Sequence, residues 1–226
     1  MTSEPRYTTA EMDAGDRLFR RPWDFVRGAP SPEALPAADR PEVAFAGRSN
    51  VGKSSLLNAL VRQRRLARVS QTPGRTQELN FFAAPDVACY LVDLPGYGFA
   101  KAPHGKIAAW TGLLAEYLRG RATLARVFLL IDARRRLKPA DRSVMRRLDD
   151  AAVSYQLILT KADKIPGEAL ADALAALAAA AAEHPAAHPT QLATSAITGD
   201  GIDLLRAEIA LLLAERGSDP SLHEPA

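Results

Sequence analysis

One octapeptide constrains the fold of this chain more than any other segment. Residues 47–54 read GRSNVGKS and fit the pattern G-x-x-x-x-G-K-[ST]. The apolar run EVAFAG (42–47) precedes them and has the length of a strand, while SSLLNALVRQ (54–63) follows with helical spacing of its apolar residues. Glycines in such a turn let backbone N–H groups point inward around an anion, and the helix N-terminus adds its dipole. The segment therefore predicts a phosphate-binding loop between a strand and a helix.

Short apolar runs and helical patterns alternate along the rest of the chain. RVFLLID (126–132) and SYQLILT (154–160) have the pattern of buried strands, and a helical pattern follows each of them. LNFFAA (79–84) and VACYLVD (87–93) flank a Pro-Asp turn and predict a hairpin. This alternation predicts an α/β fold with a mostly parallel, six-stranded sheet and helices on both faces.

Two later segments bear on which nucleotide base would fit. The sequence TKAD (160–163) ends a predicted strand and matches the pattern [NT]-K-x-D. A carboxylate at Asp163 can accept hydrogen bonds from N1–H and the exocyclic amine of guanine, a pair that adenine does not offer. Lys161 would lay its stem over the base. TSA (194–196) ends the last predicted strand, where a backbone N–H can bond the guanine O6.

Asp93 ends another apolar strand and begins the pattern D-x-x-G. A carboxylate there can hold Mg²⁺ through water, and Gly96 can offer its N–H to a γ-phosphate. The preceding loop SQTPGRTQELN (70–80) is rich in turn formers, and a threonine hydroxyl within it can ligate Mg²⁺. We expect Thr76 rather than Thr72 in that role. The order of these motifs along the chain is that of switch GTPases.

Four segments together resemble one family of bacterial GTP-binding proteins. They are PEVAFAGRSNVGKSSLLNAL, TPGRTQELNFF, VDLPGYGFAK and TKAD. The combination is similar to the EngB family, also called YsxC or YihA, of the TrmE-Era-EngA-EngB-Septin-like GTPase class, over roughly residues 19–215. The resemblance implies a Ras-like P-loop GTPase domain that hydrolyses GTP to GDP and phosphate with Mg²⁺. It also implies a role in assembling the large ribosomal subunit, and a link to cell division and septation.

The motif match implies a set of site residues. Those expected to serve catalysis are Lys53, Thr76, Gly96 and Asn50. Those expected to hold Mg²⁺ are Ser54, Thr76 and, through water, Asp93. Those expected to contact GTP or GDP are Gly47, Arg48, Ser49, Asn50, Val51, Gly52, Lys53, Ser54, Gly74, Arg75, Thr76, Gln77, Glu78, Asp93, Leu94, Pro95, Gly96, Thr160, Lys161, Ala162, Asp163, Thr194, Ser195 and Ala196.

Three positions are informative about affinity and rate. Thr160 stands where many other GTPases have asparagine, so its hydroxyl would tether the phosphate loop with fewer hydrogen bonds. Asn50 is a hypothetical K⁺ ligand, because related GTPases with asparagine there can bind K⁺ next to the phosphates. Tyr97 follows Gly96, where many switch GTPases carry the glutamine that orients the attacking water. We therefore expect slow intrinsic hydrolysis, raised by K⁺ or a ribosomal partner and nearly unchanged by Tyr97→Ala.

Length and composition bound the organisation of the chain. With 226 residues, of which 47% are hydrophobic, it can form one domain with a full core. We expect a partly mobile extension at residues 1–40, a GTPase domain at 41–215 and a disordered tail at 216–226. An apolar cluster within residues 19–26 is expected to dock as a short helix that covers the sheet edge. Since no signal sequence or long apolar run is found, we expect a cytoplasmic monomer without membrane contact.

Arginine and lysine concentrate in two stretches, although the formal net charge is only +3. Residues 119–147 contain ten of them against two aspartates, and residues 62–75 contain five with no acid. One interpretation is a set of solvated helices. The other is a surface that contacts the phosphates of ribosomal RNA, with binding that weakens steeply with salt. Aromatic stacking platforms are missing nearby, so we expect contact with the RNA backbone rather than sequence reading.

Two other functions are compatible with these motifs. A P-loop kinase would transfer the γ-phosphate to a small molecule and would need lid arginines, whereas a non-hydrolysing module would only sense GTP over GDP. Asp163 and the pair Ser195-Ala196 argue against the kinase, since a kinase of this size usually takes ATP. Displacement of labelled GDP by ATP at similar concentration would contradict the guanine hypothesis, and single-turnover hydrolysis would separate an enzyme from a sensor.

Overall fold

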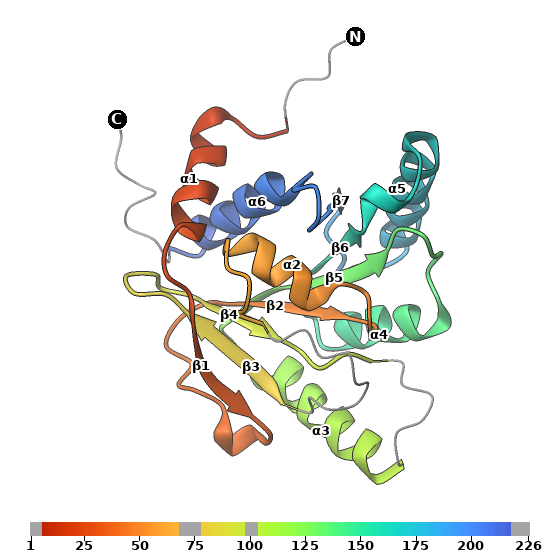
Figure 1. Cartoon of the computed structure of the whole chain (residues 1–226). Coiled ribbons are helices and arrows are strands. Elements are labelled where there is room, and N and C mark those ends of the chain that lie inside the picture. Colours follow the sequence, from red (N-terminus) through yellow and green to blue (C-terminus); the bar gives the residue numbers. More distant parts are fainter. Residues whose placement is uncertain (1–5, 68–77, 98–103, 218–226) are drawn as a thin grey trace.

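The computed structural model describes residues 6–67, 78–97 and 104–217 (Figure 1). The strands are β1 (Asp24–Ala29), β2 (Glu42–Gly47), β3 (Leu79–Ala83), β4 (Tyr90–Asp93), β5 (Leu124–Asp132), β6 (Tyr155–Thr160) and β7 (Leu192–Ala193). The helices are α1 (Thr9–Phe19), α2 (Lys53–Leu60), α3 (His104–Gly120), α4 (Pro139–Asp150), α5 (Gly167–Ala182) and α6 (Ile202–Glu215), with 3-10 turns η1 (Pro32–Ala34) and η2 (Ala162–Lys164). In the described ranges, no helix is long and apolar enough to span a bilayer.

These strands form a single sheet in the order β1-β3-β4-β2-β5-β6-β7. β2 lies between β4 and β5 and is parallel to both, and β6 and β7 continue in parallel. β3 is antiparallel to β4, which confirms the predicted hairpin, and it is also antiparallel to β1. The predicted α/β fold is confirmed, but the sheet has seven strands rather than six. The additional strand is β1.

β1 escaped prediction because its sequence lacks alternation. The segment DFVRGA places Phe25 and Val26 side by side, and the register to β3 shifts between Phe25 and Arg27. A bulge of this kind disturbs the two-residue period on which strand recognition depends. Phe25 and Val26 are 57% and 46% exposed. The expected covering helix at residues 19–26 is therefore wrong, because a strand forms the sheet edge there.

The segment before β1 folds onto the body through α1. Thr8 caps this helix in a capping box, in which the Thr8 backbone N–H donates to Glu11 Oε2 at 2.6 Å and Glu11 N–H donates back to Thr8 Oγ1 at 3.3 Å. α1 lies along α6 (Figure 1). Phe19 and Trp23 are fully buried and stack with ring centroids 5.7 Å apart. The described part of the expected extension is thus helix, strand and packed core.

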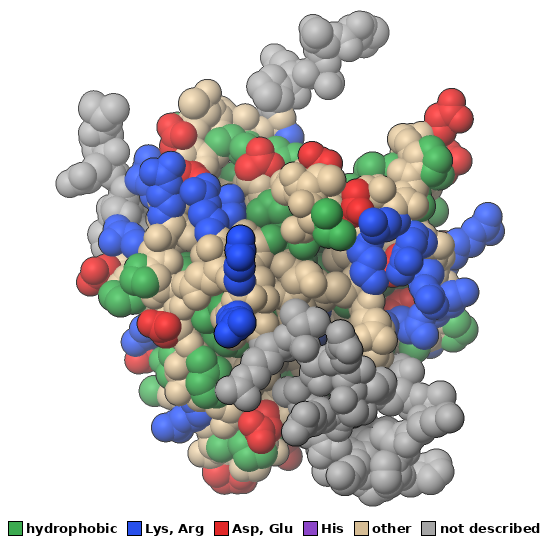
Figure 2. Space-filling model, in the orientation of Figure 1, with side chains coloured by type: hydrophobic (Ala, Val, Ile, Leu, Met, Phe, Trp, Pro, Cys, Tyr) green, Lys and Arg blue, Asp and Glu red, His purple; other side chains and the backbone are tan. Residues whose placement is uncertain are grey.

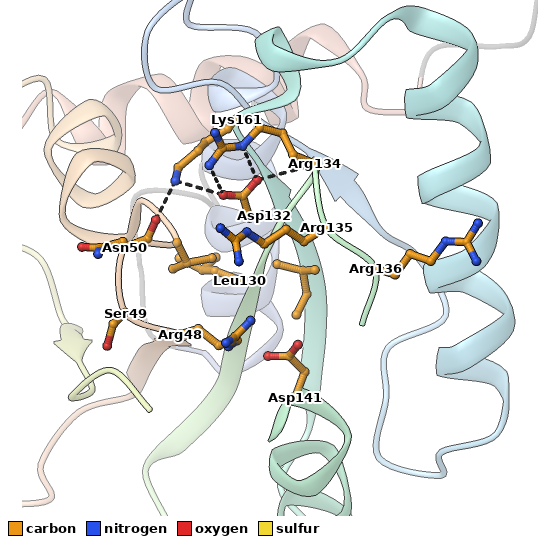
Figure 3. A pocket seen from close by; sticks show the side chains of 12 residues that line it. Arg48, Ser49, Asn50, Leu130, Asp132, Arg134, Arg135, Arg136, Asp141 and Lys161 are labelled. Carbon is orange, nitrogen blue, oxygen red and sulfur yellow. Dashed lines mark hydrogen bonds and ion pairs between the residues drawn. The ribbon is translucent and has the colours of Figure 1, made fainter. Parts of the chain in front are cut away.

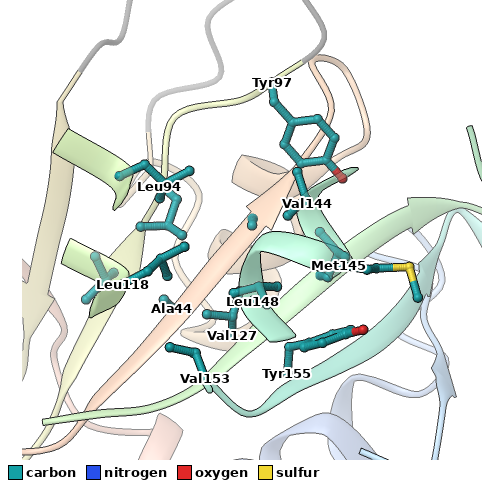
Figure 4. Close-up of a cluster of buried hydrophobic side chains, with 14 of the residues drawn as sticks. Ala44, Leu94, Tyr97, Leu118, Val127, Val144, Met145, Leu148, Val153 and Tyr155 are labelled. Carbon is teal, nitrogen blue, oxygen red and sulfur yellow. The ribbon is translucent and has the colours of Figure 1, made fainter. Parts of the chain in front are cut away.

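Both faces of the sheet are buried, as its near-continuous apolar strands require. Val43 and Phe45 of β2 point to a cluster that includes side chains of α1, α2 and α6. Ala44 and Ala46 point to the opposite cluster, with side chains of α3, α4 and α5 (Figure 4). The helices occupy both faces, so the carboxyl ends of the parallel strands are left for loops. Such an edge is where open α/β sheets bind ligands.

Candidate nucleotide site

The octapeptide 47–54 begins at the last residue of β2, continues through a loop and ends in the first turn of α2, as predicted. Two of its residues have left-handed backbone, Asn50 with φ 63° and Gly52 with φ 106°. Gly52 is the N-cap of α2, and Lys53 begins the helix. Left-handed residues that alternate with residues of ordinary backbone can turn successive amide groups to one side and form a concavity that binds anions. The loop therefore has the backbone geometry of a phosphate site.

Lys53 and Asp93 meet across this loop. The Lys53 ammonium forms an ion pair with Asp93 Oδ1, and the two side chains are only 13% and 11% exposed. Asp93 is the last residue of β4, and Ser54 follows Lys53 in the first turn of α2. One carboxylate and one hydroxyl are oxygen donors of the kind that Mg²⁺ accepts, with phosphate and water oxygens completing its shell. The residues present thus fit a phosphate-bound Mg²⁺.

The TKAD and TSA segments lie side by side after β6 and β7. Ala162 N–H donates to the Thr194 carbonyl oxygen at 3.1 Å, and Ser195 Oγ donates to Asp163 Oδ1 at 2.7 Å. The Ser195 hydrogen bond, followed by Lys164, lowers the pKa of Asp163 below its ordinary value. Asp163 is therefore an ionised acceptor at neutral pH. β7 ends at Ala193, so Ser195 lies in the loop and not at the end of the strand as predicted.

The end of β6 also holds the phosphate loop. Thr160 Oγ1 donates to the Val51 carbonyl oxygen at 2.7 Å, which is the predicted tether. Lys161 has left-handed backbone with φ 59°, and its ammonium donates to the Asn50 carbonyl oxygen at 2.6 Å. A Cβ added at Gly52 would lie 3.4 Å from Lys161 Cε. The lysine stem therefore passes over the phosphate loop.

Asp132, at the end of β5, is a site residue that the sequence analysis missed. It accepts hydrogen bonds from Arg134 Nη2 at 2.6 Å and from the Lys161 ammonium at 3.0 Å (Figure 3). Burial alone would raise the pKa of Asp132, but these hydrogen bonds outweigh burial and lower it. Its position at the end of a buried strand beside the phosphate loop resembles that of Asp93. That position is the signal by which it could have been found.

Tyr97 is a packed residue rather than an exposed loop residue. Its backbone bridges the phosphate loop, because Tyr97 N–H donates to Gly47 O and Ser49 N–H donates to Tyr97 O, both at 3.2 Å. Its ring is 5% exposed and lies beside Val144 of α4 (Figure 4). Its hydroxyl donates to Asp141 Oδ1 at 2.9 Å. Burial, and then the Asp141 charge, raise the pKa of Tyr97 far above its ordinary value, so the phenol stays protonated.

The remaining predicted site residues divide into two groups. Gly74, Arg75, Thr76 and Gln77 lie outside the described residues. Glu78 is described, and its carboxylate lies against β1, where a Cβ added at Gly28 would be 2.3 Å from Glu78 Oε2. Leu94 is buried, and its N–H donates to Phe45 O at 3.0 Å, whereas Pro95 and Gly96 continue toward the phosphate loop. A Cβ added at Gly96 would be 3.3 Å from Ser49 Oγ.

Two arginines of the arginine-rich stretch 119–147 form buried ion pairs inside the protein. Arg121 pairs with the fully buried Glu42 at 2.6 Å, and Arg126 pairs with Glu208 at 2.5 Å. These two guanidinium groups are about one tenth exposed, so they cannot belong to an RNA-contacting surface. Arg134, Arg135 and Arg136 are exposed and lie just before α4. Figure 2 shows Lys and Arg side chains gathered on the right of the molecule, where Figure 1 places this loop.

The site defines the class of P-loop GTP-binding proteins. Its features are a phosphate loop after the central strand, the Lys53–Asp93 ion pair, and the TKAD and TSA segments joined by hydrogen bonds. A family model described as a 50S ribosome-binding GTPase matches residues 42–161. The relative named probable GTP-binding protein EngB from Chelativorans sp. (strain BNC1) is 53% identical over 220 residues, covering 92% of this chain and 97% of the relative. That from Rhodospirillum rubrum is 54% identical over 214 residues, covering 93% of each chain.

Solved structures agree with this assignment at the level of the fold. The crystal structure of a probable GTP-binding protein engB has a TM-score of 0.62 and 24% identity, covering 77% of this chain and 100% of that one. Era in complex with MgGDPNP and a segment of 16S ribosomal RNA also has a TM-score of 0.62, with 23% identity over 77% of this chain and 57% of Era. The chain belongs to the EngB family of GTP-binding proteins.

Proposed function

We propose that this chain is a Mg²⁺-dependent GTPase switch that acts in the assembly of the large ribosomal subunit. The observation that carries the GTPase part is the convergence of the phosphate loop, the Lys53–Asp93 pair and Asp163 at one edge of the sheet. The ribosomal part is supported by the match to a family model described as a 50S ribosome-binding GTPase. Effects on cell division and septation would follow from failed subunit assembly. We further propose that the protein acts as a monomer in the cytoplasm.

The chemistry assigned to the site uses the chain's own groups in separate roles. Lys53 and the loop amides bind the β- and γ-phosphates, and Asp163 selects guanine by accepting from N1–H and the exocyclic amine. Ser54, Thr76 and, through water, Asp93 would hold Mg²⁺, which neutralises phosphate charge when bound. The Gly96 N–H would donate to the γ-phosphate. This arrangement requires the Lys53–Asp93 ion pair to open as the nucleotide binds.

Slow intrinsic hydrolysis is part of the proposal. The side chain after Gly96 is Tyr97, and its hydroxyl is already bound to Asp141 within the core, so it does not orient a water. Asn50 is exposed at the phosphate loop and is the proposed K⁺ ligand, although its left-handed backbone alone also favours asparagine. Comparing GTP turnover in K⁺ and Na⁺ buffers tests this role, and equal rates would contradict it.

Contact with ribosomal RNA is assigned to the exposed arginines before α4. Arg134, Arg135 and Arg136 are consecutive and exposed, and residues 133–154 around them in sequence contain no aromatic side chain. Such a surface binds phosphates without reading bases, and its affinity falls steeply with salt. Changing all three arginines to Glu is expected to abolish association with the ribosomal subunit.

The experiment that tests the proposed function measures nucleotide choice and ribosome binding on the same full-length protein. Labelled GDP should be displaced by GTP and not by a hundredfold (~2.7 kcal/mol) higher concentration of ATP. Purified ribosomal subunits are then incubated with protein in Mg²⁺ and either GDP or a non-hydrolysable GTP analogue. We expect retention on the large subunit in one nucleotide state. Displacement by ATP, or equal binding to both subunits in both states, would contradict the proposal.

A further inference from the structure

We propose that Arg48 and Arg135 form a phosphate-binding pocket beside the nucleotide site, and that its ligand is one phosphodiester group of RNA. The choice of RNA rests on the proposed function. The pocket itself rests on the placement of charged groups between the phosphate loop, the end of β5 and the start of α4 (Figure 3). This pocket would give the arginine-rich surface one defined phosphate-binding position, whereas scattered arginines alone would attract RNA without fixing where it binds.

The pocket is a hollow of about 310 Å³. The phosphate loop contributes Arg48 and Ser49 to its wall, β5 contributes Leu130 and Asp132, the following loop contributes Arg135, and α4 contributes Asp141. Arg48 and Arg135 extend into the hollow from opposite walls in Figure 3. Arg136 also lines the hollow, but its guanidinium points away from Arg48 and Arg135. Two cationic groups from separate segments therefore converge on one space.

The carboxylates around the pocket are already engaged. Asp132 is bound by Arg134 and Lys161, and Asp141 accepts from the Tyr97 hydroxyl and, at 2.8 Å, from Lys138 N–H. Neither carboxylate forms an ion pair with Arg48 or Arg135 in the part of the chain that the structure describes. The charge of Asp141 remains, because both of its donors are neutral, but cations outnumber carboxylates five to two around the hollow, so its net charge is positive. The five are Arg48, Arg134, Arg135, Arg136 and Lys161.

The two guanidinium groups have unused hydrogen-bond donors. The side chains of Arg48 and Arg135 make no hydrogen bond with any described residue, and Arg48 Nε is a buried donor without an acceptor. A buried donor without an acceptor is unfavourable unless a ligand or water accepts from it. Guanidinium groups match the geometry of phosphate oxygens and bind them with two parallel hydrogen bonds. An oxyanion is the ligand that this donor set would take.

Arg48 also joins the pocket to the rest of the site. It lies in the phosphate loop, and its backbone pairs with that of Tyr97, the residue after Gly96. A phosphate held by Arg48 would therefore contact the segment that carries GTP. A phosphodiester is favoured over a free nucleotide because Arg135 continues into the exposed Arg134 to Arg136 surface, along which a polyanion can extend.

The direct test observes the arginine Nε–H signals of the full-length protein by NMR. The protein is saturated with Mg²⁺ and a non-hydrolysable GTP analogue, so that the phosphate positions of the nucleotide site are filled. Arg48→Lys, Arg135→Lys and Arg136→Lys each remove one signal and so assign the three. Titration with inorganic phosphate should shift the signals of Arg48 and Arg135 and leave that of Arg136 in place. Titration with a uridine tetranucleotide should shift the signals of Arg48 and Arg135 more than that of Arg136, which lies along the path of the chain.

Matched variants test the energetic contribution to RNA binding. Arg135→Gln and Arg136→Gln remove the same charge from adjacent positions, but only the first removes a guanidinium that extends toward Arg48 in Figure 3. We expect Arg135→Gln to weaken RNA binding about tenfold and to lower the slope of log affinity against log salt by about one, and Arg136→Gln to weaken it by less than about twofold. Arg48→Lys keeps the charge but loses the planar guanidinium with its paired donors, so it should also weaken RNA binding. GTP affinity is the control for Arg135→Gln, which lies outside the predicted nucleotide contacts, and it should be retained there.

Each other outcome overturns the inference in a distinguishable way. Equal losses for Arg135→Gln and Arg136→Gln would mean diffuse attraction without a pocket, and the proposed ribosomal function would stand. Arg48 and Arg135 signals that move with neither ligand would exclude a phosphate site. Signals that move with inorganic phosphate alone would exclude RNA as its ligand. Failure of the ribosome pull-down, with both signals still shifted by the tetranucleotide, would remove the proposed function and leave the pocket.

Discussion

At the scale of single residues, Tyr97 shows how position in the structure changes the interpretation of a motif. Its place after Gly96 indicates a missing water-orienting glutamine. The structure adds that the ring is buried against α4 and that the hydroxyl is bound to Asp141, at the first turn of that helix. Tyr97 therefore connects the phosphate loop to α4. Tyr97→Ala would remove a buried ring as well as the phenol, so it confounds stability with turnover.

Tyr97→Phe separates these effects. The substitution removes only the hydrogen bond to Asp141, a bond to a charged acceptor, so we expect the free energy of unfolding to fall by about 2 kcal/mol. Single-turnover GTP hydrolysis should stay within about twofold of the unmodified rate, because the phenol takes no part in it. Urea unfolding and a single-turnover assay measure the two quantities.

Tyr155→Phe is the matched control for that variant. The Tyr155 hydroxyl is buried without a hydrogen-bond partner among the described residues, so its removal should not lower stability. If instead Tyr97→Phe lost tenfold or more in single-turnover rate while remaining folded, the phenol would be shown to take part in hydrolysis.

The residues that could be predicted from sequence are those defined by local motifs. Lys53, Asp93 and Asp163 stand at strand ends in short patterns, and the structure places each at the same edge of the sheet. Asp132 and Asp141 were not predicted as site residues, since their roles depend on partners far away in sequence. No local pattern reports that Asp141 accepts a hydrogen bond from Tyr97 across 44 positions.

At the scale of elements, the contact of α1 with α6 depends on one glycine. A Cβ added at Gly15 would lie 2.5 Å from the backbone nitrogen of Ala207, closer than real Cβ atoms approach. The contacting atom belongs to the backbone of α6, so it cannot turn aside as a side chain would. Gly15 therefore sets how closely the two helices pack.

Gly15→Ala should lower the free energy of unfolding by about 2 kcal/mol, even though alanine favours helix over glycine by about 1 kcal/mol. Gly112→Ala in α3 is the matched control, because no atom of the described residues lies within 4 Å of its added Cβ. That control should gain about 0.5–1 kcal/mol. Urea unfolding of both variants gives the comparison. Equal gains in stability would show that α1 does not pack against α6 in solution.

The strands of the sheet differ in how well sequence defines them. Six strands could be predicted from apolar runs bounded by turn formers. A strand that is buried on both faces needs apolar residues along its whole length, and this is visible in the local sequence. β1 has no such apolar run. It is stabilised by its pairing with β3, which is distant in sequence, and it carries a bulge. α1 was missed for a related reason: its mostly polar sequence folds onto α6, whose apolar residues lie almost 200 positions later.

At the scale of the whole molecule, a polar network joins the N-terminal segment to the domain. Arg126 donates to Glu208 and, at 3.0 Å, to Gln156 Oε1, and the Tyr7 hydroxyl donates to Glu208. His188 borders this network, with its Nε2 3.9 Å from Glu208 Oε1. Such pairings between distant segments cannot be read from sequence, which is why Arg126 was counted as a surface charge.

The network predicts a dependence of stability on pH. Burial, and next the Arg126 charge, lower the pKa of His188, while Glu208 opposes this shift and Arg6 adds to it. The unfolded chain, with a histidine pKa near 6.5, then binds a proton that the folded chain does not. The free energy of unfolding should therefore decrease as the pH falls below about 6.5. His188→Asn keeps a side-chain acceptor for Thr190 and should flatten this decrease in urea unfolding between about pH 7 and 5. An unchanged slope would assign the pH dependence to other groups.

The bulge in β1 has a consequence for how these molecules behave at high concentration. β1 is the outermost strand of the sheet, and it exposes Phe25 and Val26. A flat, apolar edge of this kind would be a template on which another molecule could add a strand and begin aggregation. The register shift between Phe25 and Arg27 breaks the even ladder of donors and acceptors that such addition needs. The irregularity that hides β1 from sequence analysis thus protects the dissolved protein from polymerising through its own sheet.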